Sequence, residues 1–331
     1  MRHSALLRLK VEVLTRGAER LPWSLLRKLV ASTTSGMRVA FCLHRVRRQR
    51  RPDELLPSLS VSETVLDEFI EQMRAARGGV GQSKWLTMAF DDGYRDAARY
   101  VTSRAARYRD VEWLLFVCPH KIRARQGFRW DAYEKRAREG HTLPHYHTYV
   151  HHQDPDYERE LRRNDLREVA GEDCYALATR QELLEAAAFE NVNLGNHSNT
   201  HMIDSLPLEQ AFRDLEESTE LFEEMFGPCR QFAFPFGVPG QHFRTPHVEY
   251  MRRLRPVVMW TTEQLPYHPS QRRPGAVLPR IVFDGAWSAK AMALWVIFRA
   301  NRMLTRRVLD RLWTLGSTGV MGALAQAAAG V

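Results

Sequence analysis

The chain has 331 residues, of which 44% are hydrophobic and 26% are charged, a balance typical of a folded globular protein. This composition excludes extensive disorder, and the length suits one α/β barrel with terminal extensions. The net charge of +9 favours an anionic membrane surface or an acidic substrate, and because no nucleic-acid-binding module is recognisable, nucleic acid is not an expected partner.

Residues 1–35 predict a basic amphipathic extension. Arg8, Lys10, Glu12 and Arg16 interrupt every apolar run that would be long enough for a signal peptide. Four cysteines at scattered positions show no paired spacing, which indicates reduced thiols. We therefore expect a cytoplasmic protein without a cleaved export signal, associated with the inner face of the membrane.

Seven apolar runs, separated by helical stretches, predict parallel strands joined by crossover helices. In such folds the functional side chains gather at the carboxyl ends of the strands. The pattern therefore predicts an α/β barrel. The runs cover residues 38–43, 85–90, 112–117, 192–195, 231–234, 257–261 and 277–283.

The first two of these strands end in polar residues. His44 follows the first and is either a proton donor facing the cleft or a packed residue of the strand end. Asp91 and Asp92 follow the second, immediately before Gly93. Two acids at a buried strand end indicate a catalytic cleft, although Asp-Asp-Gly is also a common surface turn.

The segment 135–178 reads as an insertion and is rich in histidine. We interpret it as a cap over the substrate, because long insertions in barrels usually decorate the active face. A second metal centre is the alternative, although the histidines lack regular spacing. They are His141, His145, His147, His151 and His152.

His197 and His201, four residues apart, lie on one face if the chain turns helically from Asn196 onward. A solvated helix face would show the same pattern. With one carboxylate, however, two imidazoles complete a three-ligand site for a divalent cation that leaves positions for water and a substrate oxygen. A second carboxylate beside such a site would accept the proton of the attacking water.

Further along the chain, Ser205 with Pro207 predicts the start of a capped helix, and Gly227 followed by a proline predicts its end. Pro235 and Gly237 suit a sharply turned strand end. Trp260 either forms a wall of an acyl pocket or belongs to the core.

Three segments in order resemble the motifs of the polysaccharide deacetylase family, the NodB-homology domain of carbohydrate esterase family 4. They are Phe90-Asp-Asp-Gly93, His197-Ser-Asn-Thr-His201 and Phe232-Ala-Phe-Pro-Phe-Gly237. Phe41-Cys-Leu-His-Arg-Val46 also resembles the first strand of the family. The likeness covers about residues 36–285 and implies a distorted (β/α) barrel, with residues 1–35 and 286–331 as helical extensions.

This resemblance implies a role for each motif residue. Asp92, His197 and His201 would hold a divalent metal, with zinc expected first and cobalt, manganese or nickel as alternatives. Asp91 would be the general base. The backbone N–H of Phe236 would help to stabilise the oxyanion of the tetrahedral intermediate.

Two departures from the family pattern affect the acid–base machinery. Ala233 stands where many members have an arginine that orients the catalytic aspartate. We expect Arg280, on the last strand, to fork onto that carboxylate instead; a solvent-facing or phosphate-binding arginine is the alternative. No histidine lies between Val277 and Asp284, so the general acid is unassigned, with His44 as the remaining candidate.

The sequence therefore predicts a metal-dependent hydrolase that removes an acetyl group from an N-acetylated sugar during the synthesis of cell-surface polysaccharide or glycolipid. The alternatives are a hydrolase of another non-peptide C–N bond, such as a deformylase, and a degenerate carbohydrate-binding protein. The arginine-rich segments 45–51 and 299–307 suit phospholipid headgroups or a pyrophosphate-linked sugar carrier, or else are solvated helix faces.

Near the carboxyl end, the apolar run 291–298 is too short to span a bilayer and predicts an amphipathic helix. The uncharged segment 313–331 is rich in glycine and alanine and is expected to lie against membrane or protein. The sequence does not specify the oligomeric state or the sugar.

Overall fold

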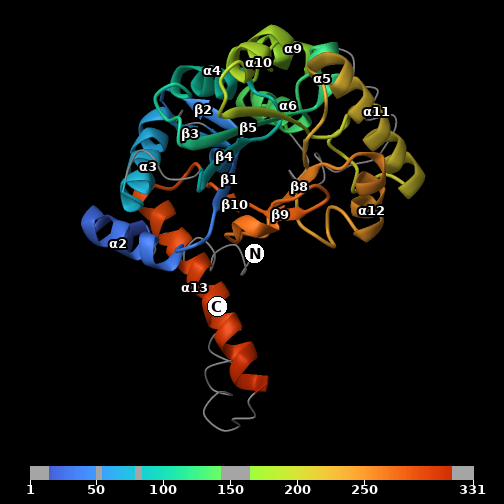
Figure 1. Cartoon of the computed structure of the whole chain (residues 1–331). Coiled ribbons are helices and arrows are strands. Elements are labelled where there is room, and N and C mark those ends of the chain that lie inside the picture. Colours follow the sequence, from blue (N-terminus) through green and yellow to red (C-terminus); the bar gives the residue numbers. More distant parts are fainter. Residues whose placement is uncertain (1–14, 50–53, 79–83, 143–164, 315–331) are drawn as a thin grey trace.

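The computed structural model describes residues 15–49, 54–78, 84–142 and 165–314. Eight parallel strands form one sheet in the order β10-β1-β4-β5-β6-β7-β8-β9, which curves into a nearly closed barrel surrounded by helices (Figure 1). The predicted fold class is confirmed. The strands are β1 (Val39–Leu43), β4 (Leu86–Phe90), β5 (Val111–Val117), β6 (Val192–Asn196), β7 (Gln231–Ala233), β8 (Val258–Thr261), β9 (Val277–Pro279) and β10 (Ile281–Val282).

The barrel closes through one extended segment. β9 pairs with β8 at one edge of the sheet, and β10 pairs with β1 at the other. Only Arg280 separates these two strands along the chain, and its backbone N–H donates to the carbonyl of Thr261. The seventh predicted strand is therefore two short strands, because the chain leaves one edge and joins the other within a single residue.

Helices surround the strands, as expected for parallel strands joined by crossover connections. Figure 1 shows α4, α10, α5, α11 and α12 in an arc outside the sheet, whereas α2 packs with α3 and α13. The helices are α2 (Trp23–Thr33), α3 (Glu63–Ala76), α4 (Arg95–Arg104), α5 (Pro119–Ala124), α6 (Arg129–Arg138), α9 (Asp165–Gly171), α10 (Arg180–Ala187), α11 (Leu208–Phe226), α12 (Thr245–Leu254) and α13 (Ala289–Thr314).

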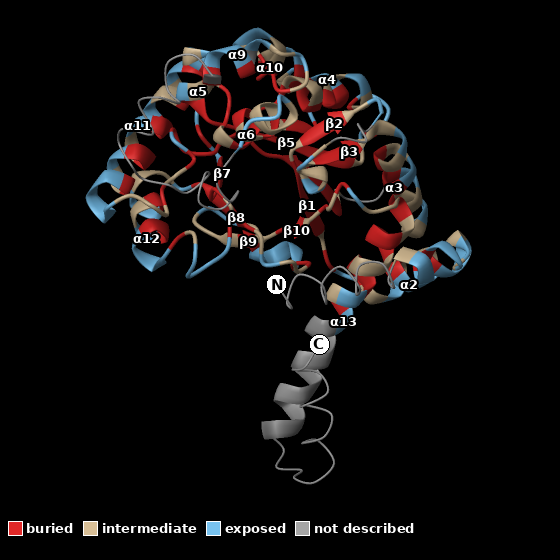
Figure 2. Ribbon diagram, turned by 180° about the vertical axis from the view of Figure 1, so that it is seen from behind, coloured by how far each residue is buried: buried red, intermediate tan, exposed pale blue. Residues whose placement is uncertain are grey.

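The strands separate two regions of apolar packing, because successive side chains point to opposite faces. Phe41 of β1 faces outward and packs edge-on against Phe69 of α3, with ring centroids 5.0 Å apart. Its neighbour Ala40 belongs to the inner cluster with Trp260 and Leu278. Figure 2 shows that the strands are buried and that exposed residues lie on the outer faces of the helices. Trp260 is therefore a core residue inside the barrel.

Two local details differ from the expectations. A two-stranded parallel sheet of β2 (Arg45–Arg47) and β3 (Ser60–Ser62) was not predicted, since each strand has only three residues. Helix α11 begins at Leu208, after Pro207, so Ser205 lies in the preceding turn rather than at the cap. The predicted stop is present, with Gly227 at φ 85°.

The predicted extensions contribute helices α2 and α13, and no helix within the described ranges has the length and apolar character that a bilayer crossing requires. Residues 315–331, which include most of the uncharged tail, lie outside the described residues, as do residues 143–164. Of the five insertion histidines, only His141 is described. Both the cap and the division into domains stay predictions.

Candidate metal centre and acid–base pair

The two adjacent acids lie where β4 leaves the sheet. The backbone N–H of Asp91 still donates to the carbonyl of Leu43 on β1, at 2.8 Å. Asp92 then takes a left-handed conformation with φ 74°, followed by Gly93 with φ 81°. Left-handed backbone is uncommon for residues other than glycine, although aspartate is enriched there. This turn buries both carboxylates at the end of the barrel, where Asp91 is 3% exposed and Asp92 is fully buried.

The two histidines follow β6 on an irregular loop, so the expectation of a helical turn is wrong. Ser198 and His201 both have left-handed backbone, with φ values of 65° and 63°. Side chains of the loop hold this shape. The Ser198 N–H donates to Oδ1 of Asn196, and the His201 N–H donates to Oγ of Ser198, each at 3.0 Å. The imidazoles nevertheless converge, with ring centroids 4.8 Å apart.

Asp214 of α11 also holds this loop, and no sequence pattern predicted this contact. Its two carboxylate oxygens accept the backbone N–H groups of Asn199 and Thr200, each at 3.0 Å. Asp214 lies within a helix, and nothing in its spacing indicates a contact with a loop about fifteen residues earlier in the sequence. The buried carboxylate therefore fixes the stretch between the two histidines.

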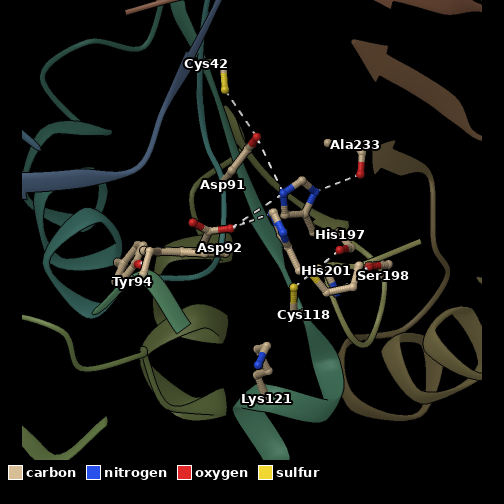
Figure 3. A network of polar contacts seen from close by, with 12 residues as sticks. Cys42, Asp91, Asp92, Tyr94, Cys118, Lys121, His197, Ser198, His201 and Ala233 are labelled. Carbon is tan, nitrogen blue, oxygen red and sulfur yellow. Dashed lines mark hydrogen bonds and ion pairs between the residues drawn. The ribbon is translucent and has the colours of Figure 1, made fainter. Parts of the chain in front are cut away.

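Asp92, His197 and His201 form one group, as Figure 3 shows. Oδ1 of Asp92 lies 3.3 Å from Nε2 of His201 and 3.7 Å from Nε2 of His197. One candidate ligand atom from each of the three side chains can be chosen so that all lie within 4.8 Å of one another. The structure thus brings together the three residues that the sequence predicted as metal ligands.

The donor atoms of this group fit a metal ion. Both carboxylate oxygens of Asp92 and Nε2 of His197 are buried without a hydrogen-bond partner. Buried polar atoms in that state are unfavourable unless another group satisfies them. Nδ1 of His197 donates to the carbonyl of Ala233 at 2.8 Å, which leaves the Nε2 lone pair facing Asp92. The identity of the metal stays a prediction.

The electrostatics of the imidazoles also suit metal binding. Burial lowers the pKa of His197 to about 4 and the pKa of His201 to about 3. Both rings are therefore neutral at pH 7 and offer lone pairs. Burial, opposed by His44 and His197, raises the pKa of Asp92. A nearby cation would favour the ionised form of that carboxylate.

Arg280, the residue between β9 and β10, holds the carboxylate of Asp91. Its Nη1 donates to Oδ1 of Asp91 at 2.6 Å, and its Nη2 donates to Oδ2 at 2.9 Å. The bidentate contact expected from the sequence is therefore present, and because the arginine is fully buried, a solvent-facing side chain is excluded. Burial alone would raise the pKa of Asp91, but Arg280 and His197 hold it well below its usual range. The carboxylate is thus ionised at neutral pH.

Cys42 and His44 lie on the same side of the site as Asp91. The Cys42 thiol donates to Oδ2 of Asp91 at 3.3 Å, and burial raises the thiol pKa, so the donor is protonated. Candidate ligand atoms of Cys42, His44 and Asp91 also lie within 4.8 Å of one another. Both oxygens of Asp91 already accept from Arg280, so this second group is the poorer metal site.

Phe236 lies beside the histidines, as the third motif implies. Its backbone has φ 56°, and its ring meets the ring of His201 edge-on at 4.7 Å. The next residue must be glycine, because a Cβ at Gly237 would lie 2.8 Å from the side chain of Thr262. The role of the Phe236 N–H toward an oxyanion stays a prediction.

No family model and no curated protein matches the chain at the sequence level. Among solved structures, the Streptococcus pyogenes deacetylase PplD in complex with acetate is 11% identical, with a TM-score of 0.51, over 78% of this chain and 98% of that chain. BA0330 from Bacillus anthracis, assigned to the polysaccharide deacetylases, is 10% identical with a TM-score of 0.50, over 78% and 69% of the two chains. The chain has the fold of the polysaccharide deacetylases. IcaB from Ammonifex degensii is 17% identical, with a TM-score of 0.46, over 78% of this chain and 96% of that chain.

Within this polysaccharide-deacetylase fold, an aromatic wall beside His201 was not predicted. Trp130 of α6 meets the His201 ring edge-on at 4.9 Å, and Phe128 does so at 5.8 Å. Trp130 also donates through Nε1 to the hydroxyl of Tyr94, at 2.7 Å. These residues precede the predicted insertion, and their sequence has no metal-site pattern.

A buried ionic cluster supports that wall. Arg45 of β2 is fully buried and pairs with Asp131 and, at 3.0 Å, with Glu134 of α6. The hydroxyl of Tyr94 donates to Asp131 at 2.9 Å. Arg45 was predicted as part of a surface-docking segment. For this residue that interpretation is wrong, because its charge is neutralised inside the protein.

Proposed function

We propose that the protein is a metal-dependent deacetylase that hydrolyses the acetamide of an N-acetylated sugar. The observation that carries this proposal is that a group of candidate metal ligands and a candidate general base lie side by side in one buried site. Asp92, His197 and His201 offer three converging ligand atoms, while Asp91 lies beside them as an ionised carboxylate. The polysaccharide-deacetylase fold supports the same activity.

Asp92, His197 and His201 would hold the cation, and a cation bound there would polarise the acetyl carbonyl and acidify water. Asp91 is placed to accept a proton, since its Oδ2 lies 3.7 Å from Nε2 of His197, next to the ligand group. Arg280 keeps this carboxylate ionised and fixes its orientation through both oxygens. We assign Asp91 as the general base and Phe236 as the source of an N–H directed at the oxyanion.

His44 is the best-placed candidate for the general acid that protonates the leaving amine. It lies near Asp91 at the end of β1, and burial lowers its pKa. The neighbouring Asp92 and Asp91 oppose that shift and favour its protonated form. No histidine occupies the late strand β9 or β10.

The proposed substrate is an N-acetylated sugar of a cell-surface polysaccharide or a lipid-linked precursor, and the proposed metal is zinc. We place the reaction on the cytoplasmic side of the membrane. Helices α2 and α13, which pack together, carry the exposed apolar side chains Leu25, Leu29 and Phe298. Exposed apolar residues beside basic ones suit the headgroup region of an anionic membrane.

The test is release of acetate from N-acetylated oligosaccharides by the purified full chain, with and without a chelator. We expect zinc to restore activity after chelation. Formate release from N-formyl substrates would instead support the deformylase. Glycan binding without release of either acid would support the carbohydrate-binding alternative and overturn the hydrolase.

Two variants separate metal binding from catalysis. Asp91→Asn should retain the metal and lose about 100-fold or more in turnover, because a general base contributes about 10² to 10⁴. Asp92→Asn should lose both metal and turnover. Asp110→Asn is the matched control, since this carboxylate pairs with Arg74 away from the site. Full turnover in Asp91→Asn would contradict the assignment.

A further inference from the structure

A large cavity lies outside the barrel, between α5, α9, α10 and the end of α11. Figure 1 shows α9 and α10 beside α5 at the rim of the molecule. The cavity has a volume of about 870 Å³, within the range of about 300 to 1,000 Å³ typical of small-molecule sites. None of the predicted metal ligands lines it. The cavity is therefore a separate feature from the metal centre.

The lining of this cavity is strongly cationic. Among the described residues, five arginines contribute to it, and the one carboxylate is that of Glu224. Ile122, Leu177 and Met225 supply apolar wall between them. The arginines are Arg95, Arg123, Arg125, Arg167 and Arg180.

The charges are only partly neutralised. Arg95 pairs with Glu182, and Arg123 pairs with Glu224. Arg180 donates through Nε to a backbone carbonyl at 2.7 Å, which supplies no negative charge. Within the part of the chain that the structure describes, Arg125 and Arg167 form no hydrogen bond or ion pair through their side chains. Like charges around one concave surface repel, and a bound multivalent anion would relieve that repulsion.

The backbone at Arg125 adds a second observation. This residue ends α5 in the left-handed conformation, with φ 50°. Glycine is the usual residue at such a position, because a side chain there costs about 1 kcal/mol or more. Helix termination therefore does not explain an arginine at this position, whereas a requirement for its guanidinium does.

We propose that this cavity binds a phosphate or diphosphate group. Guanidinium groups match phosphate oxygens in geometry as well as in charge, and several can share one diphosphate. Gln181 adds a side chain that can hydrogen-bond to the ligand, whereas the Thr179 hydroxyl is already bonded to Glu182 at the start of α10. The proposal concerns a second site and does not rest on the proposed deacetylation.

The wall of this cavity is joined to the metal centre through the backbone. Ala178 donates its N–H to the carbonyl of Gly93 at 2.9 Å, directly after Asp92. Ile122 packs against the same glycine, so that a Cβ there would lie 3.3 Å from its Cδ1. A phosphate bound in the cavity would thus lie behind the turn that positions Asp92.

The test is calorimetric titration of the full chain with inorganic pyrophosphate. The chain is kept free of metal so that the anion cannot coordinate an ion at the metal centre. The double variant Arg125→Gln/Arg167→Gln should bind on the order of tenfold or more weakly than the wild type. Arg109→Gln/Arg253→Gln is the matched control, because it removes the same charge from two exposed arginines outside the cavity. Circular dichroism checks the fold of both variants.

Unchanged binding by the control together with the loss in the cavity variant supports the proposal. Equal weakening in both variants would show that only net charge matters and would overturn the proposal. A wild type that binds no pyrophosphate at millimolar concentration would also overturn the proposal. Vesicles of phosphatidylglycerol test a lipid source. If only vesicle binding depends on Arg125 and Arg167, these arginines face a membrane and the diphosphate pocket is wrong.

Discussion

At the residue scale, the two adjacent carboxylates of the candidate site differ in their contacts. Asp92 has buried oxygens without hydrogen-bond partners, whereas both oxygens of Asp91 accept from Arg280. Neighbouring aspartates in one sequence motif therefore have opposite environments. Their pKa values also move in opposite directions, because Arg280 lowers the pKa of Asp91, while burial raises the pKa of Asp92.

Arg280→Gln should shift the pH dependence of turnover. Without the guanidinium, burial dominates and raises the pKa of Asp91, so the acid limb of the profile moves to higher pH. We expect a loss of about 100-fold at neutral pH, consistent with about 3 kcal/mol for an unpaired buried charge. The measurement is acetate release from pH 4 to 9, with Arg109→Gln as control. An unshifted acid limb would show that another group keeps Asp91 ionised.

Asp91 also makes the free energy of unfolding depend on pH. The folded-state pKa of Asp91 is depressed, so its contribution is present above the unfolded pKa of about 4 and is lost as pH falls through the depressed value.

His44→Gln tests the candidate general acid. Removal of a proton donor should lower kcat by about 10² or more while leaving the bound metal unchanged. The readouts are turnover and metal content per chain. A variant with wild-type kcat would leave His44 as a packed strand-end residue.

At the element scale, the loop that carries the candidate ligands His197 and His201 is held by side chains of two helices. Helix α11 supplies Asp214, and α6 supplies the aromatic wall beside His201. The sequence predicted the strands and the convergence of Asp92, His197 and His201, because alternating apolar runs and motif order are local features. It did not predict Asp214 or Trp130, whose function depends on tertiary contacts that no spacing rule encodes. The non-helical path from Asn196 to His201 was missed for the same reason.

Asp214→Ala should loosen the loop that carries the proposed metal ligands His197 and His201. Two backbone N–H groups would lose charged acceptors, which is worth about 1.5 to 3 kcal/mol each at most. We expect metal affinity to fall about 10- to 100-fold, as for other partners that orient ligands. The measurement is competition with a chromogenic chelator. Glu217→Ala, an exposed change on the same helix, is the control, and an equal loss there would refute a specific role for Asp214.

At the scale of the whole molecule, the α2/α13 pair extends the barrel with an apolar and basic surface. Figure 1 shows α13 projecting away from the strands. The net charge of +9 fits attraction to an anionic surface, yet part of the arginine content is internal, as Arg45 and Arg280 show. The number of arginines in the sequence therefore overstates the number at the surface. The net positive charge of the surface is not reduced, because buried carboxylates pair with both of these arginines.

Leu25→Ser/Leu29→Ser should weaken binding to phosphatidylglycerol vesicles. Each leucine contributes about 1.5 to 3 kcal/mol when its side chain is fully buried in an apolar phase, so partial insertion of two predicts about tenfold or more. The measurement is vesicle co-sedimentation at physiological salt. Leu208→Ser replaces a comparably exposed leucine on α11 and should sediment like the wild type. Equal sedimentation of the leucine pair variant would argue against docking through α2.

Arg280 joins the two edges of the sheet, where β9 ends and β10 begins, so the barrel closes at this one position. The main-chain hydrogen bonds of β9 belong to one edge and those of β10 to the other, and the residue between them also holds Asp91. Opening of the barrel at this position would therefore disturb both the closure of the sheet and the protonation of Asp91, the proposed general base. Local opening between β9 and β10, measured as amide hydrogen exchange at Ile281, should accordingly rise and fall with the acid sensitivity of the proposed acetate release.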